Sequence, residues 1–517
     1  MRYPLFGILG FAVVFAVCSC TVSPPSQDDE ESSATSDSEE EEDNSKSKND
    51  KKKQSSHSDE ESEEECEGES GEPWDGTTAK DFACGAGTKL SPYIIKTAEQ
   101  LAHLSFIVNA NEKEYQGKYY KLGADIKLNK GNVIDKKGAL VGDSAKLHKW
   151  TPIGNSSVPF TGNFDGDGYT ISGMFINTTS THNGLFGNSS GTVQNLTIEN
   201  SWVSGGDATA GIVGNLKDVA FIRNVVNKAS VIGINNVIGG IVGSYETVCC
   251  NKTGTIENVE NHGFITGSKT VGGIIGKGGN LRIVNARNYA EVVGTSYTGG
   301  IAGELEANSI MDSSANYAKI TGKDYIAGIA GYLGYAYSCN SDNKRGTLSN
   351  SKNVGDIEGE KYTAGLVGKS ECTKNLNVAN DAKIIGSTYT AGLFGYIRNS
   401  TIESAYNTGD IFGSIYVGGI AGDNEEGVTS SAYSTGKVDG DSLVGLMIGY
   451  NFNTTMADYY YLKRGEQEPF GLNNGGGVAT PKTSKEMKSE KFAELLGEEF
   501  VYDSDLNDGY PVFNWEE

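Results

Sequence analysis

Residues that could carry catalysis or bind a metal are few and badly spaced in this 517-residue chain. None of its five histidines belongs to an HExxH motif, and the chain has neither a Walker phosphate loop nor a GxSxG nucleophile elbow. The histidines are His57, His103, His148, His182 and His262. Asp165-x-Asp167-Gly168 resembles the start of a calcium loop, but the later carboxylates of such a loop are missing. We therefore predict a tight turn there, and no metal site, cofactor or catalytic centre.

Five tyrosines recur at steps of 28, 37, 27 and 27 residues and could bind a ligand through their rings. They are Tyr297, Tyr325, Tyr362, Tyr389 and Tyr416. Stacked at the ~4.8 Å spacing of neighbouring strands, they would form an aromatic row able to stack on sugars or on a polymer chain. The alternative is that the rings only pack together. Alternation favours packing, because Tyr297, Gly299 and the core residue Ile301 would share one face of an unbroken strand.

Besides Cys20 itself, six cysteines would remain after cleavage before Cys20, and an exported protein permits disulfides. Cys339 and Cys372 lie in or near insertions of adjacent repeats, so this pair is the first expectation. Cys66 with Cys84, and the vicinal Cys249–Cys250, are weaker expectations. Because six cysteines allow about fifteen pairings, the sequence leaves the connectivity open.

An internal repeat must position these residues. The tetrapeptide Gly-aliphatic-apolar-Gly recurs with a base period of 27 residues and small insertions, which is typical of a solenoid with loops of variable length. Its copies begin at Gly184, Gly211, Gly240, Gly273, Gly300, Gly328, Gly365, Gly392 and Gly419, with a worn copy at Leu446.

Other columns keep step with this tetrapeptide. One is an asparagine column: Asn227, Asn261, Asn288, Asn316, Asn353, Asn380 and Asn407. We expect these side chains to lie inward or at a corner and to pass hydrogen bonds from coil to coil. We expect the glycines to mark turns that need a positive φ. Proline is absent between Pro159 and Pro469, as required of strands that must donate their N–H groups to neighbours.

The tetrapeptide resembles the GLUG motif of bacterial surface and secreted proteins, over about ten copies. The flanks are similar to those of the same proteins: TrpThrProIleGly at 150–154 and PheAspGlyAspGlyTyrThrIle at 164–171 before the repeats, and AsnAspGlyTyrPro at 507–511 after them. The resemblance implies a surface lipoprotein of adhesin-like character. Some proteins with the motif are metallopeptidases, but the missing HExxH argues against that activity here.

The fold expected is all-β: a right-handed parallel β-helix of about ten coils, each of ~27 residues. We assign 73–183 to an N-terminal cap and first coils, 184–449 to the repeat solenoid and 450–517 to a C-terminal cap. A capping box, Thr97-x-x-Gln100, predicts a helix near 98–109. A second, Thr483-x-x-Glu486, predicts a helix that Gly497 closes. These helices should cover the open ends of the solenoid.

The first 20 residues read as a lipoprotein signal peptide: Arg2, a short apolar stretch and Ser19-Cys20. We expect Cys20 to carry a lipid, with plain secretion as the alternative. The absence of Asp directly after Cys20 favours the outer membrane and a surface-exposed protein. Segment 21–72 has 20 acidic residues and 5 lysines, a net −15 of the chain's −24, and is expected to be a disordered tether.

The sequence leaves three functions open. The first is a non-enzymatic surface lipoprotein that binds an extracellular glycan or a host or neighbour surface protein. The second is a polysaccharide-processing β-helix enzyme, disfavoured because acidic residues fall at scattered columns of the repeat. The third is a structural envelope stalk. Nucleic acid is excluded as a partner because the folded part is acidic.

Overall fold

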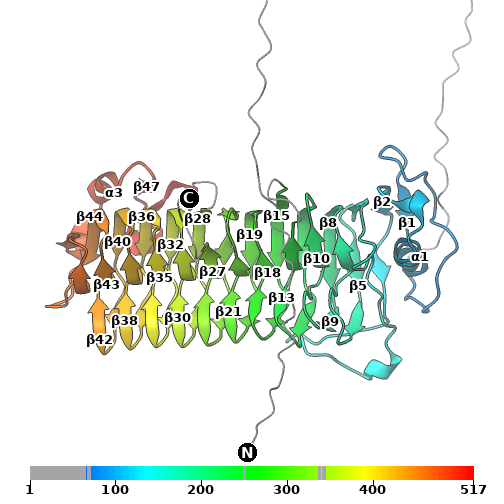
Figure 1. Ribbon diagram of the computed structural model, residues 1–517, viewed down its shortest axis with the longest axis horizontal. Coiled ribbons are helices and arrows are strands. Elements are labelled where there is room, and N and C mark those ends of the chain that lie inside the picture. Colours follow the sequence, from blue (N-terminus) through cyan, green and yellow to red (C-terminus); the bar gives the residue numbers. More distant parts are fainter. Residues whose placement is uncertain (1–65, 67–70, 248–251, 336–338, 340–344, 517) are drawn as a thin grey trace, which may run out of the picture. The chain divides into compact units, whose positions relative to one another are not determined.

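The computed structural model describes residues 66, 71–247, 252–335, 339 and 345–516. The signal peptide, Cys20, most of the tether and the Cys249–Cys250 pair lie outside the described residues. Within them the chain is a parallel β-solenoid of about 13 turns, which confirms the expected fold class (Figure 1). The count exceeds the predicted ten because coils without the tetrapeptide precede and follow the ten copies. The right-handed sense stays a prediction.

Each complete coil contributes strands to four parallel sheets, visited in the order sheet 1, sheet 3, sheet 4, sheet 2. Sheet 1 consists of β1 (Tyr93–Ile95), β2 (Tyr119–Leu122), β3 (Ile126–Lys127), β4 (Asn163–Asp165), β5 (Thr170–Ser172), β8 (Thr192–Glu199), β11 (Phe221–Asn227), β15 (Gly254–Asn261), β19 (Leu281–Asn288), β23 (Ile310–Asp312), β24 (Ala315–Asn316), β28 (Gly346–Asn353), β32 (Thr373–Asn380), β36 (Thr401–Asn407), β40 (Val428–Ser434), β44 (Thr455–Leu462) and β46 (Ala479–Lys482). Sheet 2 consists of β7 (Phe186–Ser189), β10 (Val213–Lys217), β14 (Val242–Glu246), β18 (Ile275–Gly278), β22 (Ala302–Leu305), β27 (Ala330–Gly334), β31 (Val367–Glu371), β35 (Phe394–Arg398), β39 (Ala421–Glu425), β43 (Ile448–Phe452) and β45 (Phe470–Asn474).

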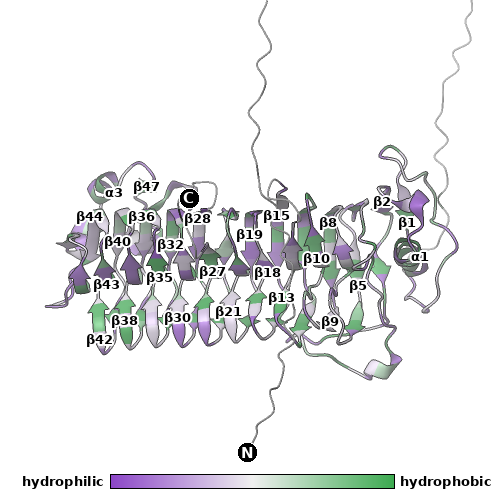
Figure 2. Ribbon diagram, in the orientation of Figure 1, coloured by the Kyte–Doolittle hydropathy of each residue, from purple (hydrophilic) through white to green (hydrophobic). Residues whose placement is uncertain are grey.

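The two remaining solenoid sheets are built from shorter strands. Sheet 3 consists of β6 (Phe175–Asn177), β9 (Trp202–Gly205), β12 (Ser230–Gly233), β16 (Ile265–Thr266), β20 (Val292–Val293), β25 (Ile320–Thr321), β29 (Ile357–Glu358), β33 (Ile384–Ile385), β37 (Ile411–Phe412) and β41 (Val438–Asp439). Sheet 4 consists of β13 (Val237–Gly239), β17 (Thr270–Gly272), β21 (Ser296–Gly299), β26 (Asp324–Ala327), β30 (Lys361–Ala364), β34 (Thr388–Ala391), β38 (Ile415–Gly418) and β42 (Ser442–Gly445). Polar and apolar residues alternate along many of these ribbons, as expected of strands with one face in the core (Figure 2).

The tetrapeptide forms the corner between sheets 4 and 2. In the copy that begins at Gly300, the consecutive residues Ile301 and Ala302 are both fully buried. Both side chains point into the core because the chain changes direction at this corner. None of the tetrapeptide glycines has a positive φ, so that expectation was wrong. They are required by close approach: a Cβ on Gly300 would overlap the side-chain oxygen of Asn316 and the carbonyl oxygen of Gly328.

The asparagine column stands at the corner between sheets 1 and 3, fully buried as expected. Each Nδ2 donates to the Oδ1 of the next asparagine at 2.8–2.9 Å, from Asn227 through to Asn407. The same Nδ2 donates to the carbonyl two residues further on, as Asn316 does to Ala318 at 2.8 Å. The column is therefore a continuous, satisfied ladder through the core.

The predicted N-terminal helix is confirmed as α1 (Ala98–Asn109), with both hydrogen-bonded halves of its Thr97–Gln100 capping box. The single C-terminal helix was wrong: α2 (Ser484–Met487) ends early, and Ser489 caps a new helix, α3 (Glu490–Leu496). A hairpin of β47 (Phe500–Val501) and β48 (Val512–Phe513) follows. Short 3-10 turns occur at Lys113–Tyr115, Ser144–Lys146, Asn507–Gly509 and Asn514–Glu516.

The C-terminal segment from α2 to residue 516 does not cover the solenoid end. It packs along sheet 1 of the solenoid (Figure 1). On the outer face of that sheet, Phe492, Phe500 and Phe513 form a second core with Tyr406 and Tyr433. Three outward-facing tyrosines in consecutive coils, Tyr406, Tyr433 and Tyr460, supply the apolar surface that holds it there. No described helix is both long and apolar enough to cross a membrane.

Candidate functional site: a tyrosine ladder and a charged strip

The five tyrosines form a ladder along sheet 4, each as the second residue of its strand in β21, β26, β30, β34 and β38. Successive ring centroids are 4.5, 4.7, 4.6 and 4.6 Å apart, and the ring planes differ by 1–11°. The side chains are half-buried on the outside of the coil. We call these five residues the tyrosine ladder.

The ladder faces outward because each of its tyrosines has a positive φ, between 43° and 59°. A left-handed residue interrupts strand alternation, so the following residue turns inward instead; Thr298, Thr363 and Thr390 are fully buried. The expectation that Tyr297 shares a face with Ile301 was therefore wrong. The bulge that would send the ring outward lies at the tyrosine itself rather than at the glycine pair.

Ring stacking along the ladder limits what the ladder can bind. Each internal ring has a neighbouring ring on both faces, so a ligand meets ring edges and hydroxyls rather than open faces. Burial, helped by the adjacent rings, raises the pKa of Tyr325 and of Tyr389 to about 12. These hydroxyls stay protonated at neutral pH and present a row of hydrogen-bond donors, not a flat platform for sugar rings.

A second outward column runs beside the ladder on sheet 2. It contains the residue that follows the last glycine of the seven tetrapeptide copies from Gly273 onward: Lys277, Glu304, Tyr332, Lys369, Tyr396, Asp423 and Tyr450. Its tyrosines meet the ladder edge to face, with Tyr389–Tyr396 at 6.3 Å and Tyr416–Tyr450 at 6.1 Å. With the acidic residues two positions further along the strands, we call this column the charged strip.

The charged strip gathers carboxylates that the sequence had suggested were scattered. Lys277 pairs with Glu304 at 3.0 Å and Lys369 pairs with Glu371 at 3.0 Å. The Tyr396 hydroxyl donates to Glu425 at 2.9 Å. The inference from scattered columns was wrong, since the register brings these residues onto one face. The residue after each tetrapeptide was visible in the sequence, and aligning it would have found the strip.

Asp423 is the unusual member of the charged strip. Its side chain is 4% exposed, and one of its carboxylate oxygens is buried without a hydrogen-bond partner among the described residues. Tyr396 and Tyr450 flank it in register. Burial first, and the charge of Glu425 second, raise the pKa of Asp423 to about 7. Its charge state therefore changes near neutral pH.

The other residues singled out in the sequence have structural roles. Cys339 and Cys372 form a disulfide, as do Cys66 and Cys84. Asp165 accepts hydrogen bonds from the Asp167 backbone at 2.8 Å and from Asn195 at 2.9 Å, so its carboxylate is used by a turn. Across the part of the chain that the structure describes, no cluster of three metal-ligating side chains occurs.

Comparison with known proteins gives partial matches. No family model matches the chain. Halomucin of Haloquadratum walsbyi is 33% identical over 178 residues, which are 33% of this chain but 2% of halomucin. The "Putative Gly-rich membrane protein" of Evansella cellulosilytica is 36% identical over 140 residues, 26% of this chain and 14% of that protein. The alignments therefore span only small parts of these relatives.

One solved structure is also similar. The crystal structure of a "putative immunoglobulin A1 protease" from Bacteroides ovatus matches over 84% of this chain and 96% of that one, with 16% identity and a TM-score of 0.31.

Proposed function

We propose that this chain is a non-enzymatic bacterial surface lipoprotein, anchored in the outer membrane by Cys20, whose solenoid binds an extended polysaccharide along the tyrosine ladder and charged strip. The observation that carries the proposal is the axial repetition of tyrosyl hydroxyls at 4.5–4.7 Å between rings over five coils. A row of like donors suits a ligand that repeats along one direction, and a linear polysaccharide carries a hydroxyl acceptor on every unit.

The resemblance to GLUG-motif surface proteins supports the location, as does the name of the Evansella relative, which places that protein in a membrane. Charged groups beside the ladder add acceptors and donors without adding a catalytic cluster. Lys277, Glu304, Lys369 and Glu371 are paired with one another, which suits recognition of a polar ligand more than proton transfer.

Binding should depend on the hydroxyls more than on the rings. The test is a glycan-array screen of the full chain, followed by affinity measurements on a Tyr362→Phe, Tyr389→Phe double variant. This variant keeps the stack and removes two donors, so we expect about a tenfold loss or more, at about 1 kcal/mol per hydrogen bond. Tyr502→Phe, on the C-terminal segment, is the matched control and should bind like the parent. Unchanged affinity in the double variant would exclude the ladder as the site.

The alternative is a polysaccharide-processing enzyme, which one observation favours. A carboxyl group with a pKa raised to about 7, as in Asp423, has the property required of a general acid. Release of reducing ends from a bound glycan by the parent, lost in Asp423→Asn, would replace the binding proposal with this one. If the parent binds no glycan, the structural envelope stalk remains as the function.

A further inference from the structure

A pocket of about 590 Å³ lies on the opposite side of the coil from the ladder, between sheet 1 and the last turn of the C-terminal segment. Its walls include Arg287, Tyr317, Asn350 and Trp515. Neither the repeat nor the C-terminal segment forms this pocket alone, because the solenoid supplies the first three of these residues and the final turn supplies Trp515.

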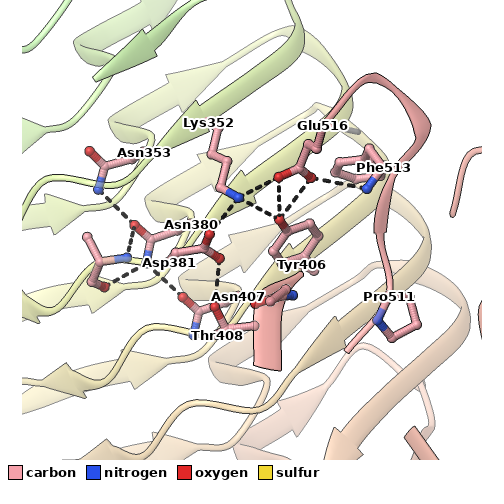
Figure 3. A network of polar contacts seen from close by, with 12 residues as sticks. Lys352, Asn353, Asn380, Asp381, Tyr406, Asn407, Thr408, Pro511, Phe513 and Glu516 are labelled. Carbon is pink, nitrogen blue, oxygen red and sulfur yellow. Dashed lines mark hydrogen bonds and ion pairs between the residues drawn. The ribbon is translucent and has the colours of Figure 1, made fainter. Parts of the chain in front are cut away.

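The final turn is fixed in place by a buried polar network (Figure 3). Lys352 of β28 forms ion pairs with Asp381 and with Glu516, and the Tyr406 hydroxyl donates to Glu516 at 2.8 Å. Burial alone would lower the pKa of Lys352, but the two carboxylates outweigh it and raise that pKa, so the lysine stays charged. Glu516 also accepts from the Phe513 backbone at 3.1 Å. The Trp515 wall of the pocket is therefore held in place through its neighbour Glu516.

Two aromatic rings line the pocket, and each has one face free of ring contacts among the described residues. Tyr317 is 45% exposed and is the last ring of a three-ring stack. Tyr289 covers one of its faces, with the two ring centroids 5.0 Å apart. Trp515 is 37% exposed and stacks on Phe513 at 5.7 Å. This differs from the tyrosine ladder, whose internal rings are covered on both faces. Aromatic faces that no other ring covers, with polar groups nearby, are a usual way to hold a sugar ring.

Arg287 gives the pocket its charge. One guanidinium nitrogen, Nη1, donates to the backbone carbonyls of Ala286 and Ser313, and no described carboxylate pairs with the side chain. Its remaining N–H donors are available to a ligand. Lys352, the other cation of the lining, is already neutralised by Asp381 and Glu516. An arginine with free donors matches a carboxylate in a planar, two-point geometry.

We propose that this pocket binds an acidic sugar: a pyranose ring against Tyr317 and Trp515, with its carboxylate on Arg287. Asn350 and Ser313, both partly exposed in the lining, would serve the ring hydroxyls. The site is separate from the tyrosine ladder and does not depend on what the ladder binds. Its ligand could be a single unit or one residue of a chain, since both carry the same group.

Titration of the full chain with glucuronate and N-acetylneuraminate, with glucose as the neutral control, tests the proposal. We expect at least one acidic sugar to bind, and to bind about tenfold more tightly than glucose. Arg287→Gln should remove that preference, and Trp515→Ala should weaken binding of every sugar. Arg282→Gln, an exposed arginine on the same strand that does not line the pocket, is the matched control and should bind as the parent does.

Circular dichroism of each variant separates lost binding from lost folding, and a Trp515→Phe variant, which keeps an aromatic face, should retain most of the affinity. An oligouronate that binds no more tightly than glucuronate would indicate a single-unit ligand, and tighter binding would indicate a chain; either supports the pocket. The proposal is overturned if neither acidic sugar binds the parent, or if Arg282→Gln and Arg287→Gln weaken binding equally.

Discussion

Asparagine and glycine act as partners in this solenoid. The asparagine ladder fits at its corner only because the first glycine of the tetrapeptide has no side chain, so the two columns constrain one another across the coil. The asparagine then satisfies backbone carbonyls that no strand can reach at the corner. Conversely, the left-handed positions of the coils are taken mainly by asparagine, tyrosine and serine, and rarely by glycine. Side-chain hydrogen bonds or ring stacking accompany many of these strained conformations.

Removing one side-chain amide from the asparagine ladder should lower the stability of the fold. Asn316→Ala removes the donor to Asn353 and the acceptor for Asn288, both buried, and should lower the free energy of unfolding by about 1–3 kcal/mol. Denaturant unfolding measures it. Asn235→Ala, an exposed asparagine, is the control and should change stability by less than about 0.5 kcal/mol. A variant as stable as the parent would contradict the structural role given to the ladder.

Asp423 should make stability depend on pH. Because its pKa in the folded state is raised to about 7 from the usual 3.8, the folded state binds the proton more tightly than the unfolded state. Stability contributed by the protonated form is present at acidic pH and is lost as the pH rises towards 7. Besides Glu425, the groups near this carboxyl are the tyrosines of the strip and ladder.

Asp423→Asn should therefore raise the free energy of unfolding at pH 8 by an amount on the order of 1–3 kcal/mol, seen as a higher melting temperature, and change it little at pH 4. Thermal unfolding of both proteins from pH 4 to 8 checks this. An equal effect at the two pH values would mean that titration of Asp423 is not the cause.

At the scale of the element, the corner made by the tetrapeptide is the least tolerant part of a coil. Gly300→Ala would push a methyl group into Asn316 and Gly328, both in the next coil, and should lower the free energy of unfolding by about 1–3 kcal/mol or more. Gly279→Ala is the matched control: its added carbon would approach mainly the flexible Glu306 side chain, so a small effect is expected in urea unfolding. Equal effects of the two substitutions would show that close packing does not explain the motif.

The elements also show what a sequence can reveal. The repeat, the asparagine ladder and α1 were predictable, because periodicity and a capping box are local signals. The outward tyrosines were not, since parity assumes a regular strand and Tyr362 adopts a left-handed φ of 54°. The charged strip was present as a column in the sequence, but its meaning depended on knowing which strand lies beside the ladder. The break after α2 depended on competition between two capping residues, Thr483 and Ser489.

At the scale of the whole molecule, the C-terminal segment packs against the side of the solenoid instead of its end. Glu516 contacts Lys352 although it follows it by 164 residues in the sequence. A helix pattern could not predict this position, because Lys352 and the three tyrosines that hold the segment come from four separate coils. The C-terminal segment leaves the face of the tyrosine ladder uncovered, because the segment packs on sheet 1. The two proposed binding faces are thus set apart by the fold itself.

The last prediction concerns the anchor, which lies outside the described residues. Arg2, the apolar stretch that ends near Val17 and the small residue Ser19 before Cys20 together favour lipid attachment at Cys20, and the acidic segment after it would extend away from the membrane by self-repulsion. Growth with a fatty-acid probe should label the parent and the Cys18→Ala variant, but not Cys20→Ala. Labelling that persists in Cys20→Ala and disappears in Cys18→Ala would move the attachment site by two residues, and an unlabelled parent would mean plain secretion.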